Sequence, residues 1–348
     1  MAGKPCDPEL LQQAINIYHQ CGQNKNAAAR AIGLPKATYT HRLALAQSKG
    51  LQPNDKKPFE SVDLPDDEIS TEELLETRIR QFERRRDATV ARKLIPITVK
   101  IDGPIGIVHF GDPHVDDDGT DLGMLREHVK VVNQTEGLFG ANLGDLQNAW
   151  IGRLARLWAE QSTNSKQAWR LVEWLVRSVD WLYLVAGNHD AWVGHGDPVQ
   201  WMMRTASGVY EPWGVRLALQ FPNGRQVRCN ARHDFHGHSM WNPAHGPMKA
   251  VQSGWRDHIL TCGHKHTSFI GGPLKDPASG LLSWAIRCAG YKSIDRYANQ
   301  EGLPDQNAFA AAVTIIDPRY DDDDTRLITV IPDVAEGAEF LRYKRRKK

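Results

Sequence analysis

Two histidines, His264 and His266, stand two positions apart behind a glycine in the segment TCGHKHTS. Side chains at positions i and i+2 of a strand point to the same face of a sheet. At the end of a strand, two such imidazoles can converge on one metal ion or on two neighbouring ions. A polar loop that happens to hold two histidines is the commoner explanation of an isolated H-x-H, so the rest of the chain has to decide.

Four earlier clusters also combine oxygen and imidazole side chains, and none of them contains a cysteine. They are GDPH, GDLQN, GNHD and ARHDFHGH, and with GHKH they supply seven candidate ligands: Asp112, His114, Asp145, Asn188, His233, His264 and His266. Two divalent metal ions need about ten to twelve ligand positions, shared among side chains, waters and substrate oxygens. These seven side chains can therefore build a two-metal centre.

Each cluster follows a predicted strand or a glycine. The segments IGIVHFGDPHVDDDG, GLFGANLGDLQNAW and DWLYLVAGNHDAW each predict a strand that runs into a loop, and LGMLREHVKVVNQ and KQAWRLVEWLVRSV predict helices between them. Asn223-Gly224 predicts the tight turn of a later β-hairpin. Alternating strands and helices predict an α/β layered sheet, in which ligand sites lie beyond the carboxyl ends of the strands.

The ordered set of clusters resembles the calcineurin-like metallophosphoesterase superfamily over roughly residues 100–320. The blocks of that superfamily run D-x-H, G-D, G-N-H-[DE], H and G-H-x-H, and four of the five are present literally and in order. The resemblance implies a layered metallophosphoesterase-type β-sandwich flanked by helices. It also implies a metal-dependent phosphoric ester hydrolase.

The same resemblance implies a role for each residue. Asp112, His114 and His266 would hold the first metal, and Asn188, His233 and His264 the second, with Asp145 bridging the two. His189 would stand outside the ligands and face the phosphate as a catalytic acid. Asp190 would either orient His189 or brace the loop.

The implied chemistry follows from the charges of the two cations. They bind phosphoryl oxygens and lower the pKa of a shared water, so that hydroxide forms near neutral pH and attacks phosphorus. Mixed nitrogen and oxygen ligation favours manganese, iron, zinc or nickel over calcium or magnesium.

The fourth block is ambiguous, because RHDFHGHSMWNPAH holds four histidines. The superfamily places the ligand of this block at the end of a strand, before a loop. VRCNARH predicts that strand, so the resemblance implies His233 as the ligand, with His238 as the substitute. His109, inside the first strand, is predicted to be a packed core histidine. The acidic run 116–118 is predicted to be a solvated loop, with the alternative that Asp116 supports the metal ligands from behind.

Residues 8–47 predict three short helices that resemble a helix-turn-helix of DNA-binding proteins. The third helix would present Lys36, Thr38, Tyr39, His41 and Arg42 to a groove or to phosphates. The alternative is a small helical bundle used for oligomerisation, so a homo-oligomer stays open.

The predicted organisation has four parts. A helix-turn-helix-like domain spans residues 1–50, a linker and connecting helix 51–93, a metallophosphoesterase domain 94–341 and a basic tail 342–348. The net charge is +1, but residues 1–50 carry +4 and the run RYKRRKK ends the chain, whereas residues 94–341 carry −7. Basic ends favour a polyanion such as nucleic acid, although a disordered solubilising tail is the alternative for the C-terminal run. An acidic middle suits phosphate chemistry only if bound cations reverse the local field.

Composition excludes several classes of protein. No apolar run approaches the length of a membrane span, and the N-terminus lacks the pattern of a signal peptide. Five scattered cysteines without a C-x-x-C argue against a disulfide framework and a zinc ribbon, and favour a cytoplasmic location.

The leading hypothesis is a metal-dependent phosphodiesterase or nuclease that acts on DNA. One alternative is a phosphomonoesterase or protein phosphatase that its helical domain localises to DNA. Another is a non-enzymatic DNA-binding protein built on a hydrolase fold. The fusion of a helix-turn-helix to such an enzyme is also associated with phage or prophage origin.

Overall fold

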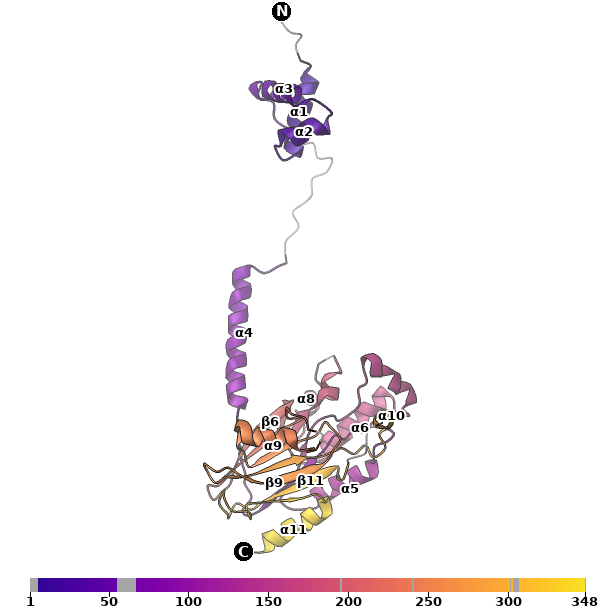
Figure 1. The fold of residues 1–348 in the computed structure, drawn as a ribbon, viewed down its shortest axis with the longest axis vertical. Coiled ribbons are helices and arrows are strands. Elements are labelled where there is room, and N and C mark those ends of the chain that lie inside the picture. The colour runs from indigo at the N-terminus through magenta and orange to yellow at the C-terminus, as the bar shows by residue number, and fades with distance from the viewer. Residues whose placement is uncertain are drawn as a thin grey trace, which may run out of the picture. The chain divides into compact units, whose positions relative to one another are not determined.

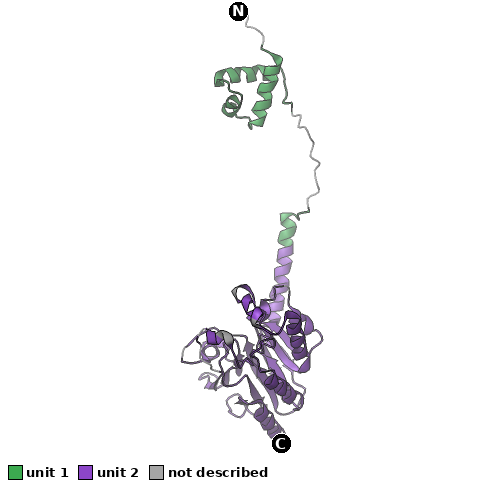
Figure 2. Ribbon diagram, turned by 90° about the vertical axis from the view of Figure 1, so that its right-hand side faces the viewer, with its two compact units in different colours: residues 1–76 green, residues 77–348 purple. Residues whose placement is uncertain are grey.

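The computed structural model describes residues 6–54, 67–194, 196–239, 241–300, 302 and 307–347. The chain divides into two compact units, residues 1–76 and 77–348 (Figure 2). Each unit contains its own cluster of buried apolar side chains, so the two are described separately. Residues 55–66 of the predicted linker lie outside the described residues.

The N-terminal unit contains three short helices, as predicted: α1 (Pro8–Gln20), α2 (Lys25–Ala31) and α3 (Lys36–Ser48). The side chains of Asp7 and Asn24 cap α1 and α2 by accepting hydrogen bonds from their first N–H groups. Gly33 has a φ of +64°, which a glycine adopts easily after a helix. The core of this unit is built from eight buried side chains: Leu11, Ala14, Ile15, Ala28, Ala29, Tyr39, Leu43 and Ala46.

One residue predicted to contact DNA belongs to this core. Tyr39 is fully buried, and its hydroxyl donates a hydrogen bond of 2.8 Å to the carbonyl oxygen of Ala14. The prediction for Tyr39 is therefore wrong. Successive residues of a helix point about 100° apart, so a residue next to an exposed one can face the interior. Lys36 and Thr38 are exposed on the same helix, and Arg42 is half-buried.

The predicted connecting helix is α4 (Thr71–Arg92), which Figure 1 shows as one uninterrupted helix. The side chain of Ser70 accepts a hydrogen bond of 3.2 Å from the backbone N–H of Glu73, which is one half of a capping box. None of the α4 side chains, all of which are described, is buried.

Two six-stranded mixed sheets form the second unit (Figure 1). The strand order of the first sheet is β1 (Ile95–Thr98), β6 (Gly214–Gln220), β7 (Gln226–Arg232), β8 (Ile259–Cys262), β10 (Leu282–Arg287) and β9 (Phe269–Lys275). That of the second is β12 (Ile328–Ile331), β11 (Ala311–Ile316), β2 (Ile105–Phe110), β3 (Leu138–Asn142), β4 (Trp181–Ala186) and β5 (Val209–Pro212). The predicted β-hairpin is confirmed as the antiparallel pair β6 and β7.

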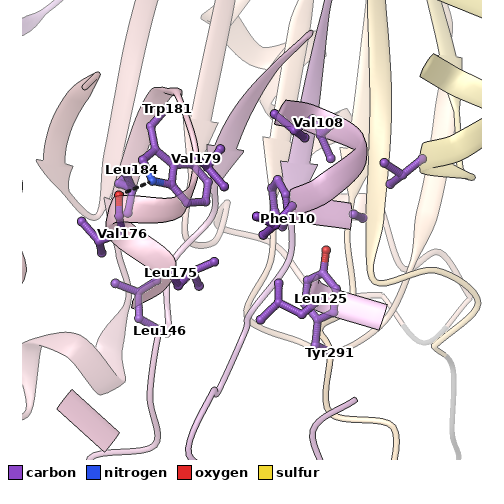
Figure 3. Close-up of a cluster of buried hydrophobic side chains, with 14 of the residues drawn as sticks. Val108, Phe110, Leu125, Leu146, Leu175, Val176, Val179, Trp181, Leu184 and Tyr291 are labelled. Carbon is purple, nitrogen blue, oxygen red and sulfur yellow. Dashed lines mark hydrogen bonds between the residues drawn. The ribbon is translucent and has the colours of Figure 1, made fainter. Parts of the chain in front are cut away.

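The two sheets face each other across one apolar core, to which β2 contributes Ile107, β6 Leu217 and β8 Ile259. The other face of the second sheet packs under three helices: α5 (Leu122–Asn133), α6 (Ser165–Ser178) and α11 (Val334–Arg346). Figure 3 shows part of this second core, where the ring of Phe110 lies 5.5 Å from that of Trp181. Burial on both faces explains why β2 is apolar along nearly its whole length.

Shorter helices lie in the connections: η1 (Gly152–Glu160), α7 (Asn188–Ala191), α8 (Pro198–Met202), α9 (His245–Ala250), η2 (Val251–Trp255) and α10 (Arg296–Gln300). A small apolar cluster joins Ala250 and Val251 to Leu260 on the outer face of the first sheet. The predicted α/β class, with helices flanking the sheets, is therefore confirmed. Within the described ranges, the structure contains no helix with the length and apolar character that a membrane crossing requires.

The basic C-terminal run is largely part of the fold. Helix α11 continues to Arg346, across the predicted boundary at residue 341. The Arg342 guanidinium donates to the hydroxyl of Thr135 at 2.8 Å, and the Lys344 ammonium lies 3.2 Å from a carboxylate oxygen of buried Asp317. These contacts fix the basic side chains against the second unit, so residues 342–346 do not behave as a separate tail.

The predicted core histidine, His109, lies in the middle of β2. Its side chain is fully buried, with Nδ1 2.9 Å from the hydroxyl of Tyr183 and Nε2 2.9 Å from that of Thr314. Burial lowers the pKa of His109 to about 3, because the charged imidazolium would lose its hydration.

We expect this histidine to make the second unit acid-sensitive. In the unfolded chain a histidine has a pKa of about 6.5, so on acidification the unfolded state is protonated before the folded state. The free energy of unfolding is therefore unaffected above about pH 6.5 and falls between that pH and about pH 3. The loss should approach about 1.4 kcal/mol per pH unit. Urea unfolding of metal-free protein, followed by tryptophan fluorescence, measures it, because all eleven tryptophans lie in residues 150–284.

His109→Gln should flatten this pH dependence, because glutamine can form hydrogen bonds but does not titrate. The exposed His236, replaced in the same way, is the matched control and should leave the slope unchanged. An unchanged slope in His109→Gln would contradict the assignment.

Candidate metal centre

The candidate ligands lie where parallel strands end. Strands β2, β3 and β4 pair in parallel, and Asp112, Asp145 and Asn188 follow their carboxyl ends within three residues. In the first sheet β7 and β8 also pair in parallel, and His233 and His264 follow them within two residues. The sequence-predicted placement of these clusters at strand ends is thus what the structure shows.

One group of candidate ligands comprises Asp112, His114 and His266. The Nε2 atoms of the two histidines lie 3.2 Å apart, and the Nε2 atom of His266 lies 3.5 Å from a carboxylate oxygen of Asp112. Two imidazole nitrogens that face each other at this distance need a proton or a cation between their lone pairs.

A second group comprises Asp145, His233 and His264. His233 donates from Nδ1 to the carbonyl oxygen of Leu143 at 2.9 Å, which directs its Nε2 into the site. That Nε2 atom lies 3.2 Å from Asp145, 3.0 Å from Nδ1 of His264 and 2.8 Å from the side-chain oxygen of Asn188. In both groups the candidate ligand atoms lie within 4.8 Å of one another, so these Asp and His side chains, of which His266 is half-buried and His264 exposed, could hold a metal ion.

Two buried atoms of the site lack a hydrogen-bond partner among the described residues, namely an oxygen of Asp112 and Nδ1 of His114. Both side chains are almost completely buried. A buried carboxylate oxygen without a partner costs on the order of 1–3 kcal/mol or more, and a bound cation would supply the missing interaction. The donor set therefore fits a cation.

The backbone at the site is strained. Among the described residues, eight that are not glycine have a positive φ, and half of them are candidate ligands: His114 at 39°, Asp145 at 49°, His264 at 71° and His266 at 46°. Each such conformation costs on the order of 1–3 kcal/mol and persists only where the surrounding structure enforces it. Strain of this kind concentrates at functional sites, which supports a functional role for the group.

Glycines give the carboxylates room. A Cβ on Gly187 would lie 2.1 Å from an oxygen of Asp145, and one on Gly263 would lie 2.4 Å from an oxygen of Asp112. This explains the glycine in GNHD and in GHKH, since any side chain there would displace a ligand.

The electrostatics of the site favour positive charge. Burial lowers the pKa of His233, but the charge of Asp145 and a hydrogen bond to it outweigh burial and raise the pKa to about 10. Burial likewise opposes ionisation of His266, but its hydrogen bonds to Asp112 and Asp295 raise its pKa to about 9. The buried carboxylates thus attract a proton, and would attract a metal cation for the same reason.

His189 lies beside the ligands. Its ring donates from Nδ1 to the carbonyl oxygen of Asn148, and its centroid lies 4.2 Å from that of Trp192 and 5.2 Å from that of Trp150. Its Nε2 atom lies 3.9 Å from Asp145. The distances also permit His189 to form a ligand group with His114 and Asp145.

Asp190 supports the loop rather than His189. Its carboxylate accepts hydrogen bonds from the backbone N–H groups of Leu146 at 3.1 Å and Gly187 at 2.8 Å. Burial and the charge of Asp145 raise the pKa of Asp190 to about 8. This geometry matches the bracing role that the sequence left open, and it argues against Asp190 as a catalytic group.

The fourth block contributes His233 and not its substitute. His238 is exposed and belongs to none of the ligand groups, although it lines the cavity that opens in front of them. That cavity has a volume of about 1150 Å³. Its wall also includes Trp150, Trp192 and Lys292.

Sequence reasoning missed a chain of charges behind His266. The Nδ1 atom of His266 lies 3.3 Å from Asp295, and Lys292 lies 3.4 Å from Asp295 and 3.1 Å from Asp117. The prediction of a solvated loop is wrong for Asp117, which is buried. Asp116 is buried as well, which agrees with the supporting role that the sequence left open for it. Both buried carboxylates accept hydrogen bonds from Asn148: its backbone N–H donates to Asp116, and its side-chain amide donates to Asp117. A run of acidic residues carries no signal of partners so distant in sequence.

No family model matches the chain, and no curated protein matches it either. The case for a metal centre therefore depends on the geometry of these side chains.

Asp295 is expected to tune metal binding through His266. A carboxylate that accepts from the remote nitrogen of a ligating histidine fixes its tautomer, and its loss typically costs about 10- to 100-fold in metal affinity. We expect Asp295→Asn to weaken metal binding by that amount in calorimetric titrations of the metal-free protein. Asp323→Asn removes an exposed carboxylate and is the matched control. Equal affinities for the two variants would contradict the role.

Proposed function

We propose that this protein is a two-metal phosphodiesterase that hydrolyses DNA. The observation that supports it most is the meeting of two ligand groups with no member in common, Asp112–His114–His266 and Asp145–His233–His264. The groups are adjacent, because one oxygen of Asp112 accepts a hydrogen bond of 2.7 Å from the backbone N–H of His264. Two neighbouring cation sites are the arrangement that phosphoryl transfer uses repeatedly.

The proposal assigns Asp112, His114 and His266 to one metal and His233, His264 and Asn188 to the other. Asp145 would bridge them. Manganese suits these nitrogen and oxygen donors, as do iron, zinc and nickel. When bound, two such cations supply the positive charge that a phosphoryl group requires and activate water as the nucleophile. The paired six-stranded sheets agree with the metallophosphoesterase-type sandwich that the sequence motifs imply.

The chain's own contribution to the chemistry is to orient an acid. Because Nδ1 of His189 donates to Asn148, its Nε2 is the atom available to a substrate in the cavity. Trp150 and Trp192 contact the ring and fix its orientation. A protonated Nε2 there can donate to a phosphoryl oxygen or to the leaving oxygen.

DNA is proposed as the substrate because of the N-terminal unit. Its third helix exposes Lys36 and Thr38, and residues 1–50 carry a net charge of +4. Exposed basic side chains on a small helical unit favour phosphate contacts. A separate basic unit would raise the affinity of an acidic catalytic unit for the polyanion.

The direct test is metal add-back to chelator-treated protein, with manganese first. The substrates are a chromogenic phosphodiester, the matching monoester, and labelled single- and double-stranded DNA. We expect manganese-dependent cleavage of the diester and of at least one DNA form. Asp145→Asn should lower the rate by at least about a hundredfold, because even outer-shell partners of metal ligands cost 10- to 100-fold. Asp323→Asn is again the matched control.

The outcomes separate the competing functions. Hydrolysis of the monoester alone would favour a phosphatase, and no turnover with any metal would favour a binding protein. Lys36→Ala should leave hydrolysis of the small diester unchanged, weaken DNA binding and reduce the salt slope of that binding by about one. Lys49→Ala removes the same charge just beyond the end of α3 and serves as its control.

His189→Gln should lower turnover without loss of metal. General acids typically contribute about 10²- to 10⁴-fold to a rate, and glutamine cannot deliver a proton in this way. The expected result is a fall of that size in kcat with unchanged metal content by elemental analysis. His238→Gln alters another histidine of the cavity wall and should have little effect. Loss of metal from His189→Gln would instead identify His189 as a ligand.

A further inference from the structure

Helix α4 carries large apolar side chains that are exposed. Leu75, Ile79, Phe82 and Val90 are 52%, 57%, 65% and 58% exposed. Their spacing of three, four or eight residues places all four on one face of the helix. An exposed apolar stripe on a soluble helix indicates an interaction surface.

The helix also lacks the packing that usually sustains one. Most helical stability in proteins comes from burying an apolar face against other elements. Although α4 has 22 residues, none of its side chains is buried, and every one is described. A partner on the stripe would provide that burial.

The charges of α4 are divided along its length. Residues 71–76 contain three glutamates and no basic residue, whereas residues 77–92 contain six arginines against Glu83 and Asp87. A second copy aligned in parallel would place the arginine run 84–86 against itself. An antiparallel copy would place the acidic end of each helix beside the basic end of the other, which favours that orientation.

We propose that α4 is a self-association surface on which a second copy of this chain docks in antiparallel orientation. A two-fold axis between Phe82 and Glu83 sets Leu75 of each copy opposite Val90 of the other. The same register sets Glu72 opposite Lys93 and brings the two Phe82 rings together near the axis. The aliphatic part of Arg86 then covers Ile79.

The proposal does not depend on enzymatic activity. The antiparallel dimer brings two catalytic units and two N-terminal units into one assembly, which can contact a polyanion at two places. The apparent affinity for DNA would then exceed that of a single N-terminal unit.

Sedimentation equilibrium of the full chain tests the assembly. We expect a concentration-dependent species of twice the chain mass of 39.1 kDa. Ile79→Glu combined with Phe82→Glu should raise the dissociation constant at least about 100-fold, because two apolar contacts are replaced by charges. Gln81→Glu combined with Ala88→Glu adds the same charge on the opposite face and should leave it nearly unchanged. Tryptophan fluorescence and metal content show in each case that the second unit is intact.

Cysteine cross-linking tests the orientation. A chain with Leu75→Cys and a differently tagged chain with Val90→Cys should form a mixed disulfide, identified by peptide mass spectrometry. Neither variant alone should cross-link through its new cysteine. Cross-linking of Leu75→Cys to itself would overturn the antiparallel arrangement. A wild-type monomer at all concentrations, or equal dissociation of the two glutamate double variants, would overturn the interface.

Discussion

Two carboxylates buried close together, those of Asp112 and Asp145, impose the constraint on which the second unit depends. Both lie almost entirely out of water at the edge of the two sheets. Like charges in such a place require compensating positive charge, because water cannot screen them. Imidazoles converge on them from four separate segments, and glycines beside them leave their oxygens room. A metal ion held by these Asp and His side chains could supply that positive charge.

The two sheets bring segments that are far apart in the sequence to one edge, where the two carboxylates lie. Parallel strands deliver Asp112, Asp145 and Asn188 from one sheet and His233 and His264 from the other. Arg287, which is fully buried, then ties the two histidine segments together. Its guanidinium donates to the carbonyl oxygen of Gly263 at 2.5 Å and to the carboxylate of Asp234 at 2.9 Å. The guanidinium of Arg287 thus holds both histidine segments in place.

Much of this could be predicted from sequence, for an identifiable reason. The position of a short motif directly after a strand is set by that strand. The placement of the ligand clusters and the α/β class can therefore be predicted from the apolar periodicity of the segments and their order along the chain. The failures concern side chains whose surroundings come from elsewhere. Tyr39 belongs to a core that α1 completes, and Asp117 is buried by Lys292, which lies 175 positions away. The direction in which Asp190 points likewise depends on the turn that surrounds it.

The left-handed backbone at His114, Asp145, His264 and His266 makes these turns costly positions for a side chain. Glycine adopts such angles without penalty, so stability alone would favour glycine at each of the four positions. A glycine there would relax the turn but remove a candidate ligand. The stability of these turns and the supply of ligand atoms are therefore opposed at this edge of the two sheets.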